Sequence, residues 1–337
     1  MEYALLRLII SAFCSSLVSS IVIGHYFILY LHTYIAAHIR AYVPATHTIK
    51  NGTSTMGGMY ILLVIVSNII VWCHGARSCV WAVVLAMVSF GAIGLLDDWY
   101  KLMHHNGVHA KTKFILQWLA AFITTLYIVH VCGISTAITL PGLPYQLPIS
   151  LLFYLWAAFI IVSASNAVNL TDGVDGLATA VYIPAMIFFI ILFCALPACI
   201  PSLQGQDAAL LAICAAIIAG SLFGFLWHNG YPARLFMGDV GSLSLGAGLA
   251  TLALLAKAEL LLPLIGIVFV IEVLSVIAQV LSFRYRGKRI FAMAPLHHHF
   301  ELAGMHEVTI TVRATLIAII ACSFAVCVML FIGAHCA

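Results

Sequence analysis

Ten apolar stretches, each about as long as a membrane-spanning helix, dominate this sequence. A helix needs about 20 mostly apolar residues to cross a bilayer, because its backbone polar groups can be satisfied only within the helix. Hydrophobic residues make up 64% of the 337 residues and charged residues only 7%, against about a quarter in soluble domains. The sequence therefore predicts an all-α integral membrane protein with about ten transmembrane helices. The predicted stretches are residues 5–31, 56–73, 79–96, 113–132, 148–168, 176–196, 208–228, 241–256, 260–283 and 310–333.

The first stretch predicts a retained helix rather than a signal peptide. It is too long for a signal-peptide core, and no A-x-A-like cleavage site follows it. The ten stretches and their short connections leave no soluble domain. We therefore expect residues 1–337 to form a single polytopic membrane domain.

The basic residues predict the orientation, since loops rich in Lys and Arg stay in the cytoplasm. Ten crossings place both termini on the same side. One set of loops and helix ends contains Arg40, Lys50, Lys101, Lys111, Lys113, Arg234, Arg284, Arg286, Lys288, Arg289 and Arg313. The opposite set contains only Arg7, Arg77 and Lys257. We therefore expect both termini on the non-cytoplasmic side and a polar, basic cytoplasmic face.

The ten cysteines lie mostly within the apolar stretches and include no C-x-x-C pair. This distribution is typical of small hydrophobic side chains in helices, and it does not favour metal or thiol chemistry. Cys73 and Cys79 flank an outward loop, where an oxidising compartment would allow a disulfide.

Five aspartates fall at the predicted cytoplasmic ends of three stretches. Asp97 and Asp98 end the third stretch, Asp172 and Asp175 follow the fifth, and Asp239 follows the seventh. Any one of them could cap a helix, but five converging carboxylates would repel one another without a cation. Mg²⁺ and Mn²⁺ prefer oxygen ligands, and Mg²⁺ commonly binds one or two carboxylates together with phosphate oxygens. The sequence therefore predicts a divalent metal and a phosphorylated substrate.

Three polar loops accompany these aspartates. Residues 166–176 alternate amide, hydroxyl and carboxylate groups, and residues 227–243 run into a helix start whose free amides attract phosphate. Residues 295–301 contain three adjacent histidines downstream of four basic residues. Because consecutive side chains point in different directions, we do not expect one metal to bind all three histidines. Hydrogen bonds from them to phosphate or uridine groups are the favoured interpretation.

The helices themselves carry two further signals. Gly238, Ser242, Gly246 and Ala250 recur every fourth residue, which predicts a small-residue stripe for close helix packing. Glu272 is the one acid expected at membrane depth, and Gln279 follows it on the same stretch. These two side chains could line a groove or brace a loop.

Five segments together resemble a known family over nearly the whole chain. They are GTSTMGG at 52–58, LLDDWYK at 95–101, NAVNLTDGVDGLA at 166–178, FMGDVGSL at 236–243 and MAPLHHHFE at 293–301. Their order and spacing resemble the polyprenyl-phosphate hexose-1-phosphate transferase superfamily and, within it, the phospho-N-acetylmuramoyl-pentapeptide transferase (MraY) family. The histidine segment is the most specific, since sister enzymes that use other UDP-sugars carry a different histidine loop.

The resemblance implies transfer of phospho-MurNAc-pentapeptide from UDP-MurNAc-pentapeptide to undecaprenyl phosphate, giving lipid I and UMP in peptidoglycan biosynthesis. It implies Mg²⁺, a cytoplasmic cleft and a multi-pass protein of the bacterial inner membrane. Homodimers are common in the family, and no nucleic-acid partner is expected.

The resemblance also implies roles for individual residues. Asp239 matches the Mg²⁺ ligand, and Asp172 is a second candidate ligand. Asp97, Asp98, Asp172 and His298 match the catalytic positions, with Asp97 and Asp98 placed to hold or deprotonate the carrier phosphate. The candidate substrate-binding residues are Lys50, Thr55, Lys101, Lys111, Asn166, Asn169, Asp175, Asn229, Phe236, Gly238, Ser242, Gln279, His297 and His299. Direct attack is favoured over a two-step path through an aspartyl phosphate on Asp172 or Asp97.

Two other functions remain open from the sequence. The nearer is a sister transferase that moves GlcNAc-1-phosphate from UDP-GlcNAc to a polyprenyl phosphate. The remoter is a membrane transporter, since ten helices with Glu272 at depth could pass a substrate. Transport would place charged groups near the bilayer midplane, whereas nearly all of them here fall at one face.

Overall fold

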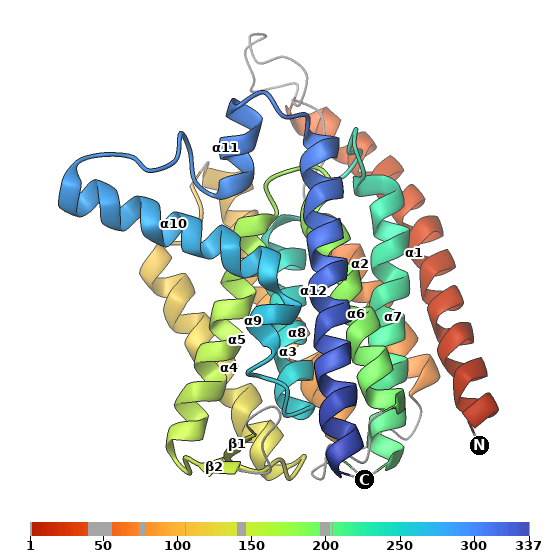
Figure 1. Cartoon of the computed structure of the whole chain (residues 1–337). Helices are drawn as coiled ribbons and strands as arrows, with labels where there is room; N and C mark the ends of the chain where they lie inside the picture. The colour runs from red at the N-terminus through yellow and green to blue at the C-terminus, as the bar shows by residue number, and fades with distance from the viewer. Residues whose placement is uncertain are drawn as a thin grey trace.

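The protein is a bundle of long helices that run side by side (Figure 1). The computed structural model describes residues 2–39, 56–73, 78–104, 106–139, 146–195, 203 and 205–336. Its long helices are α1 (Glu2–Ile39), α2 (Gly57–Trp72), α3 (Ser78–His104), α4 (Ala110–His130), α5 (Leu152–Thr171), α6 (Leu177–Ala195), α7 (Gly205–Asn229), α8 (Gly238–Leu255), α10 (Ile267–Arg286) and α12 (Glu307–Cys336). The short elements are β1 (Ala137–Thr139), β2 (Gln146–Pro148), α9 (Leu262–Ile265) and α11 (Leu296–Leu302).

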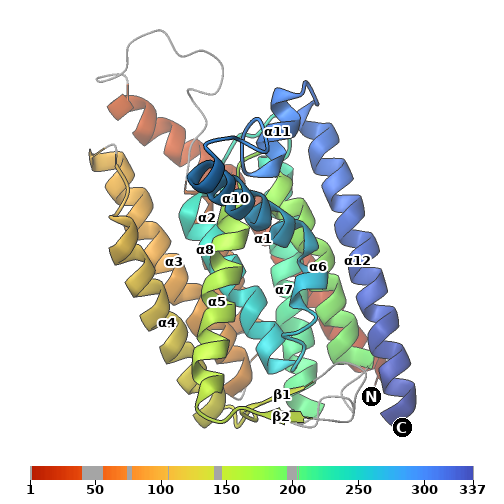
Figure 2. The same cartoon turned by 60° about the vertical axis from the view of Figure 1, so that its left-hand side comes forward.

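The predicted fold class is confirmed. Within the described part of the chain, nine helices are long and apolar enough to cross a membrane, and α2 is a shorter apolar helix of 16 residues. Nine of the ten predicted stretches each fall on one helix, and residues 260–283 cover both α9 and α10. The two ends of the chain lie at the same end of the bundle, and α11 lies at the other (Figures 1 and 2).

Helix α3 is longer than predicted, so the prediction that Asp97 and Asp98 end it was wrong. The helix continues to His104. Lys101 follows Asp97 by four residues and Asp98 by three, spacings that bring opposite charges together on one helical face. Lys101 and His104 also lie in the last turn, where positive charge is favourable. Charge pairing therefore extends the helix beyond its apolar part.

The prediction of one continuous helix over 260–283 was also wrong. Gly266 has φ −101° and ψ 31°, which is not helical, and it separates α9 from α10. Beyond this break α10 leans away from the bundle, with its far end at the left of Figure 1. The chain then returns to α11 beside the other helices (Figure 2).

A β-hairpin at the end that holds the termini was not predicted. Strands β1 and β2 pair antiparallel, with Ala137 opposite Pro148. The Lys257 ammonium donates to the carbonyls of Ser135 at 2.9 Å and Ala137 at 2.5 Å, and so ties the hairpin to the loop after α8. Strands of only three residues, Ala-Ile-Thr and Gln-Leu-Pro, are too short to give an alternation that can be recognised from sequence.

Helix α8 is the core of the bundle, since every residue from Asp239 to Leu255 is buried. It packs closely against its neighbours because glycines lie at the contacts, both on α8 and on the neighbouring helices. A Cβ added to Gly94 of α3 would lie 2.2 Å from the Asp239 carbonyl oxygen, and one added to Gly58 of α2 would lie 2.0 Å from the Gly241 nitrogen. A Cβ on Gly246 would lie 2.5 Å from the Ala164 carbonyl oxygen of α5. The predicted small-residue packing of this helix is therefore confirmed at Gly246.

We predict that Gly94→Ala lowers the free energy of unfolding by about 1–3 kcal/mol, because the new methyl group meets rigid backbone. Thermal unfolding of the purified protein in detergent measures this. Gly91→Ala is the matched control, since it lies one turn away on α3 and its close neighbour is only the flexible end of Leu62 at 2.7 Å. Equal stability of the two variants would contradict the proposed contact.

Candidate functional site

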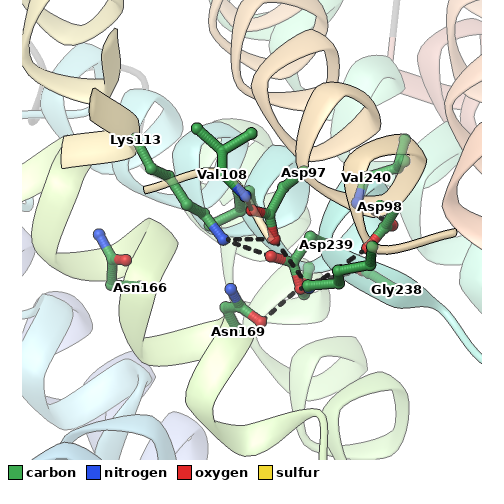
Figure 3. A network of polar contacts seen from close by, with 12 residues as sticks. Asp97, Asp98, Val108, Lys113, Asn166, Asn169, Gly238, Asp239 and Val240 are labelled. Carbon is green, nitrogen blue, oxygen red and sulfur yellow. Dashed lines mark hydrogen bonds and ion pairs between the residues drawn. The ribbon is translucent and has the colours of Figure 1, made fainter. Parts of the chain in front are cut away.

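Three aspartates from two helices form a compact cluster at the end of the bundle opposite the termini. Asp97 and Asp98 come from α3, and Asp239 comes from the first turn of α8 (Figure 3). All three are buried, and each offers a carboxylate oxygen within 4.8 Å of the others. We call these three residues the aspartate cluster. Its donors are oxygens only, the ligand type that Mg²⁺ and Mn²⁺ prefer.

Two lysines lie between these carboxylates. The Lys101 Nζ lies 2.7 Å from Asp97 Oδ2, 3.2 Å from Asp239 Oδ1 and 3.5 Å from Asp98 Oδ1. The Lys113 Nζ lies 3.2 Å from Asp97 Oδ2 and makes a second, shorter contact with Asp239 Oδ2. Opposite charges at these distances attract strongly away from water. The cluster is therefore a place where positive charge is stabilised.

Backbone amides hold the carboxylates in place. The Val108 amide donates to Asp97 Oδ1 at 2.8 Å, and the Val240 amide donates to Asp98 Oδ2 at 3.2 Å (Figure 3). Gly238 has φ +74°, and a Cβ there would lie 2.7 Å from Asp98 Oδ2. This position needs glycine both for its backbone conformation and for the approach of the carboxylate.

The start of α2 is joined to the start of α8. The Gly57 amide donates to the Phe236 carbonyl and the Gly58 amide to the Met237 carbonyl, both at 2.8 Å. Segments that are about 180 residues apart in the sequence therefore meet immediately before Asp239. Lys50 and Thr55, which precede α2, lie outside the described residues.

Asp172 is half-buried just after α5 and faces the same cluster. Burial and the negative charges of Asp239 and Asp98 raise the pKa of this carboxyl to about 7, although the Gly238 amide donates to it and opposes the rise. A carboxyl whose pKa is raised by neighbouring carboxylates holds its proton more readily than usual, and a bound cation would reverse that effect.

The polar side chains of α5 face two different partners. Asn169 Oδ1 accepts a hydrogen bond from Ser242 Oγ at 3.3 Å, beside the cluster (Figure 3). Asn166 Nδ2 donates to Gln117 Oε1 at 2.8 Å, and so joins α5 to α4. Asn169 and Ser242 therefore border the cluster, whereas Asn166 braces a helix pair.

Asp175 and Asn229 hold the segment between α7 and α8. Asp175 Oδ2 accepts from the Ala233 amide at 2.9 Å, and Asn229 Nδ2 donates to the Leu235 carbonyl at 2.9 Å. The Thr179 hydroxyl donates to Asn229 Oδ1 at 3.0 Å. Phe236, at the end of this segment, is partly exposed. These contacts shape the segment that leads into Asp239.

The three histidines lie on the short helix α11 rather than on a loop, and each has a different partner. Buried His297 places Nδ1 3.2 Å from Glu272 Oε2, and its backbone amide donates to the same oxygen at 3.3 Å. His298 Nδ1 lies 2.5 Å from Glu301 Oε2, and His299 Nδ1 accepts from the Ala292 amide at 3.2 Å. The divergence expected for consecutive side chains is thus seen in the contacts.

His297 also reaches the loop that contains Asp172. A Cβ added to Gly173 would lie 2.4 Å from His297 Nε2. His297 therefore contacts both Glu272 on α10 and Gly173, the residue that follows Asp172. Glu272 acts here as a brace for α11, one of the two roles that the sequence left open.

Gln279 likewise braces a loop. Its Oε1 accepts from the amides of Ile290 and Phe291, both at 3.0 Å, and its Nε2 donates to the Phe291 carbonyl at 2.9 Å. The side chain holds the segment after α10 against that helix. Among the predicted substrate-binding residues, Gln279 therefore lies apart from the aspartate cluster.

The sequence analysis did not select Lys113 as a site residue, and it selected Lys111 instead. Lys111 is exposed, whereas Lys113 lies between two carboxylates. Both lysines lie in the first turn of α4, so only the rotation of the helix decides which one faces the cluster. Cys73 and Cys79 are both buried, and no disulfide joins them.

Comparison with known proteins agrees with this geometry. The family described as glycosyl transferase family 4 matches residues 80–257, which include the whole aspartate cluster. A phospho-N-acetylmuramoyl-pentapeptide-transferase of Citrifermentans bemidjiense is 45% identical over 294 residues, which cover 84% of this chain and 81% of the relative. One from Geobacter sp. strain M21 has the same identity and coverage. This chain belongs to the phospho-N-acetylmuramoyl-pentapeptide-transferase family.

Membership of the phospho-N-acetylmuramoyl-pentapeptide-transferase family makes the chain a transferase and confirms the resemblance that the five sequence segments indicated. It favours the muramoyl branch over the sister enzymes that use UDP-GlcNAc. It also disfavours the transporter alternative, because both relatives are named as transferases, which are enzymes.

We predict that Gly173→Ala lowers the free energy of unfolding by about 1–3 kcal/mol, because its methyl group would displace the buried His297 ring. Thermal unfolding in detergent measures the change. Adding His297→Ala to Gly173→Ala should restore part of the loss, since the second substitution empties the space that the methyl group needs. Strictly additive losses in the double variant would contradict the contact.

Proposed function

We propose that this chain transfers phospho-MurNAc-pentapeptide from UDP-MurNAc-pentapeptide to undecaprenyl phosphate, giving lipid I and UMP. The observation that carries the proposal is the aspartate cluster at one end of an apolar bundle, in a chain 45% identical to phospho-N-acetylmuramoyl-pentapeptide-transferases. The reaction joins a water-soluble nucleotide substrate to a lipid phosphate. A site at the end of membrane-spanning helices gives both substrates access.

Mg²⁺ is the cofactor that we propose for the aspartate cluster, with Asp239 as its main ligand. Three features support the fit: the donors are all carboxylate oxygens, they lie within 4.8 Å of one another, and positive charge from Lys101 and Lys113 already lies among them. Asp97 and Asp98 are the further ligand candidates, and Asp172 faces the same space. When bound, the ion would neutralise charge on the diphosphate and on the departing UMP.

The chain's own residues would then bring two anions together. A carrier phosphate oxygen forms a bond to the sugar-bearing phosphorus, and the bond from that phosphorus to the UMP oxygen breaks. Asp97 or Asp98 accepts the remaining proton of the carrier phosphate, which takes little base strength because the second pKa of a phosphate monoester is about 6. Lys101 and Lys113, already paired with carboxylates, would stabilise phosphate oxygens. We favour this direct attack over an aspartyl phosphate intermediate.

We further propose that the polar rim of the cluster binds the donor. Asn169 and Ser242 border the cluster, and Phe236 lies in the segment that leads to Asp239. His298, paired with Glu301, would contact the substrate from α11. Correct placement of both substrates accounts for a large part of catalysis in reactions of this kind.

The cellular setting is also a proposal. We infer that the chain is a single polytopic domain of the bacterial inner membrane, that the aspartate cluster faces the cytoplasm and that the protein forms a homodimer. The orientation is supported by basic residues at the cluster's end of the bundle, including Lys101, Lys113 and Arg284. The homodimer rests on the family resemblance.

We predict that Asp239→Asn lowers Mg²⁺-dependent UMP release by at least about 100-fold. Loss of a residue that only orients a metal ligand typically costs about 10–100-fold, so loss of a ligand should cost no less. The assay offers undecaprenyl phosphate with UDP-MurNAc-pentapeptide to the detergent-purified protein, with and without Mg²⁺.

Asp207→Asn is the matched control, because Asp207 lies in the first turn of α7 at the opposite end of the bundle. It should retain full activity. Unchanged activity in a folded Asp239→Asn variant would contradict the metal assignment. UMP release from UDP-GlcNAc instead of the muramoyl donor would contradict the proposed substrate.

A further inference from the structure

A cavity of about 530 Å³ lies at the far end of α10, away from the aspartate cluster. It is open on one side and is lined by the last turns of α10 and by the segment that returns toward α11. Arg284 and Arg289 line it together with the apolar side chains of Val280, Phe283 and Met293. We call this cavity the α10-end pocket. The aspartate cluster, by contrast, lies on α3 and α8, and its contact Lys113 lies on α4.

The returning segment is held firmly against the helix. Gly287 ends α10 with φ +63°, a backbone conformation that favours glycine and reverses the chain. The Ser282 hydroxyl donates to the Lys288 carbonyl at 2.9 Å. The side-chain oxygen of Gln279 accepts from the amides of Ile290 and Phe291, and its side-chain nitrogen donates to the Phe291 carbonyl. These bonds place Arg289 beside the same cavity as Arg284. The pocket is therefore a built feature of the fold.

The charge of this region is positive and has no acidic neighbour in the sequence. Arg284, Arg286, Lys288 and Arg289 fall within six residues, and no Asp or Glu occurs between Glu272 and Glu301. Those two acids pair with His297 and His298. Four cations therefore lie together at the end of α10 and just after it, with no acidic residue near them in the sequence, and this charge favours an anionic partner.

The same helix end is also apolar and exposed. Phe283 is 60% exposed, Val280 57% and Met293 45%. Figure 1 shows α10 leaning out from the bundle, so its end projects into the space around the other helices. Side chains of this kind beside arginines suit the boundary between lipid tails and headgroups. The partner should thus combine an anionic phosphate with an acyl chain.

We propose that the α10-end pocket binds the phosphate of an anionic bilayer phospholipid between Arg284 and Arg289, with its acyl chain against Val280 and Phe283. Guanidinium groups suit this role, because each can donate two hydrogen bonds to one phosphate. A carrier-lipid phosphate has the same chemistry. The bilayer phospholipid is the occupant because the pocket lies on α10 and its return, whereas the aspartate cluster and its two lysines, where the carrier phosphate would react, lie on α3, α4 and α8.

Native mass spectrometry of the full chain in detergent, after addition of phosphatidylglycerol or phosphatidylcholine, tests the site. The variant is Arg284→Gln/Arg289→Gln, and the matched control is Arg286→Gln/Lys288→Gln, which removes the same charge from the same segment outside the pocket lining. We expect one phosphatidylglycerol retained by the native chain and by the control. The pocket variant should bind it at least about tenfold more weakly, the loss expected for one charge-assisted hydrogen bond.

Three results would overturn the proposal. Equal retention in all three proteins would place the lipid elsewhere, and equal loss in both variants would show diffuse charge attraction without a pocket. A raised KM for undecaprenyl phosphate in the pocket variant, in vesicles of phosphatidylcholine alone, would assign the pocket to the carrier instead. Lipid retention is measured without turnover, so failure of the proposed reaction would leave this test intact. Unchanged thermal unfolding shows that each variant is folded.

Discussion

The close packing of α8 against α2, α3 and α5 is the constraint on which the rest of the structure depends. Glycines at 58, 94 and 246 bring backbone against backbone, at separations where any added side chain would collide. The helix can therefore be buried along its whole length and still begin at the end of the bundle with Asp239 facing Asp97 and Asp98. A larger residue at these contacts would separate the carboxylates as well as the helices.

Ion pairs between lysines and aspartates stabilise the arrangement that the helix packing produces. Three buried carboxylates would repel one another in a poorly hydrated site, and the ammonium groups of Lys101 and Lys113 lie among them. A buried polar contact also fixes α11, where the contact of His297 with Glu272 brings this helix beside Gly173. Polar contacts across helix ends thus join α3, α4, α5, α8, α10 and α11 around one region.

The polar groups at the two ends of the bundle have different roles. At the end of the termini, Lys257 donates to carbonyls of the hairpin segment and stabilises a connection. At the other end, lysines lie among the aspartates, and the arginines of α10 are exposed. Charge is therefore concentrated where phosphates of nucleotide, carrier and bilayer would meet the protein.

The sequence by itself determined the fold class, the number of apolar stretches and the gathering of Asp97, Asp98 and Asp239 at one end, because bilayer thickness and the cost of buried charge act on composition and order. Its motifs also indicated the family. Tertiary structure alone decided that Lys113 rather than Lys111 reaches the cluster, since both lie in one turn and only helix rotation separates them. It likewise decided the break at Gly266 and the bracing roles of Gln279 and Glu272. These depend on contacts between residues distant in the chain, which periodicity cannot encode.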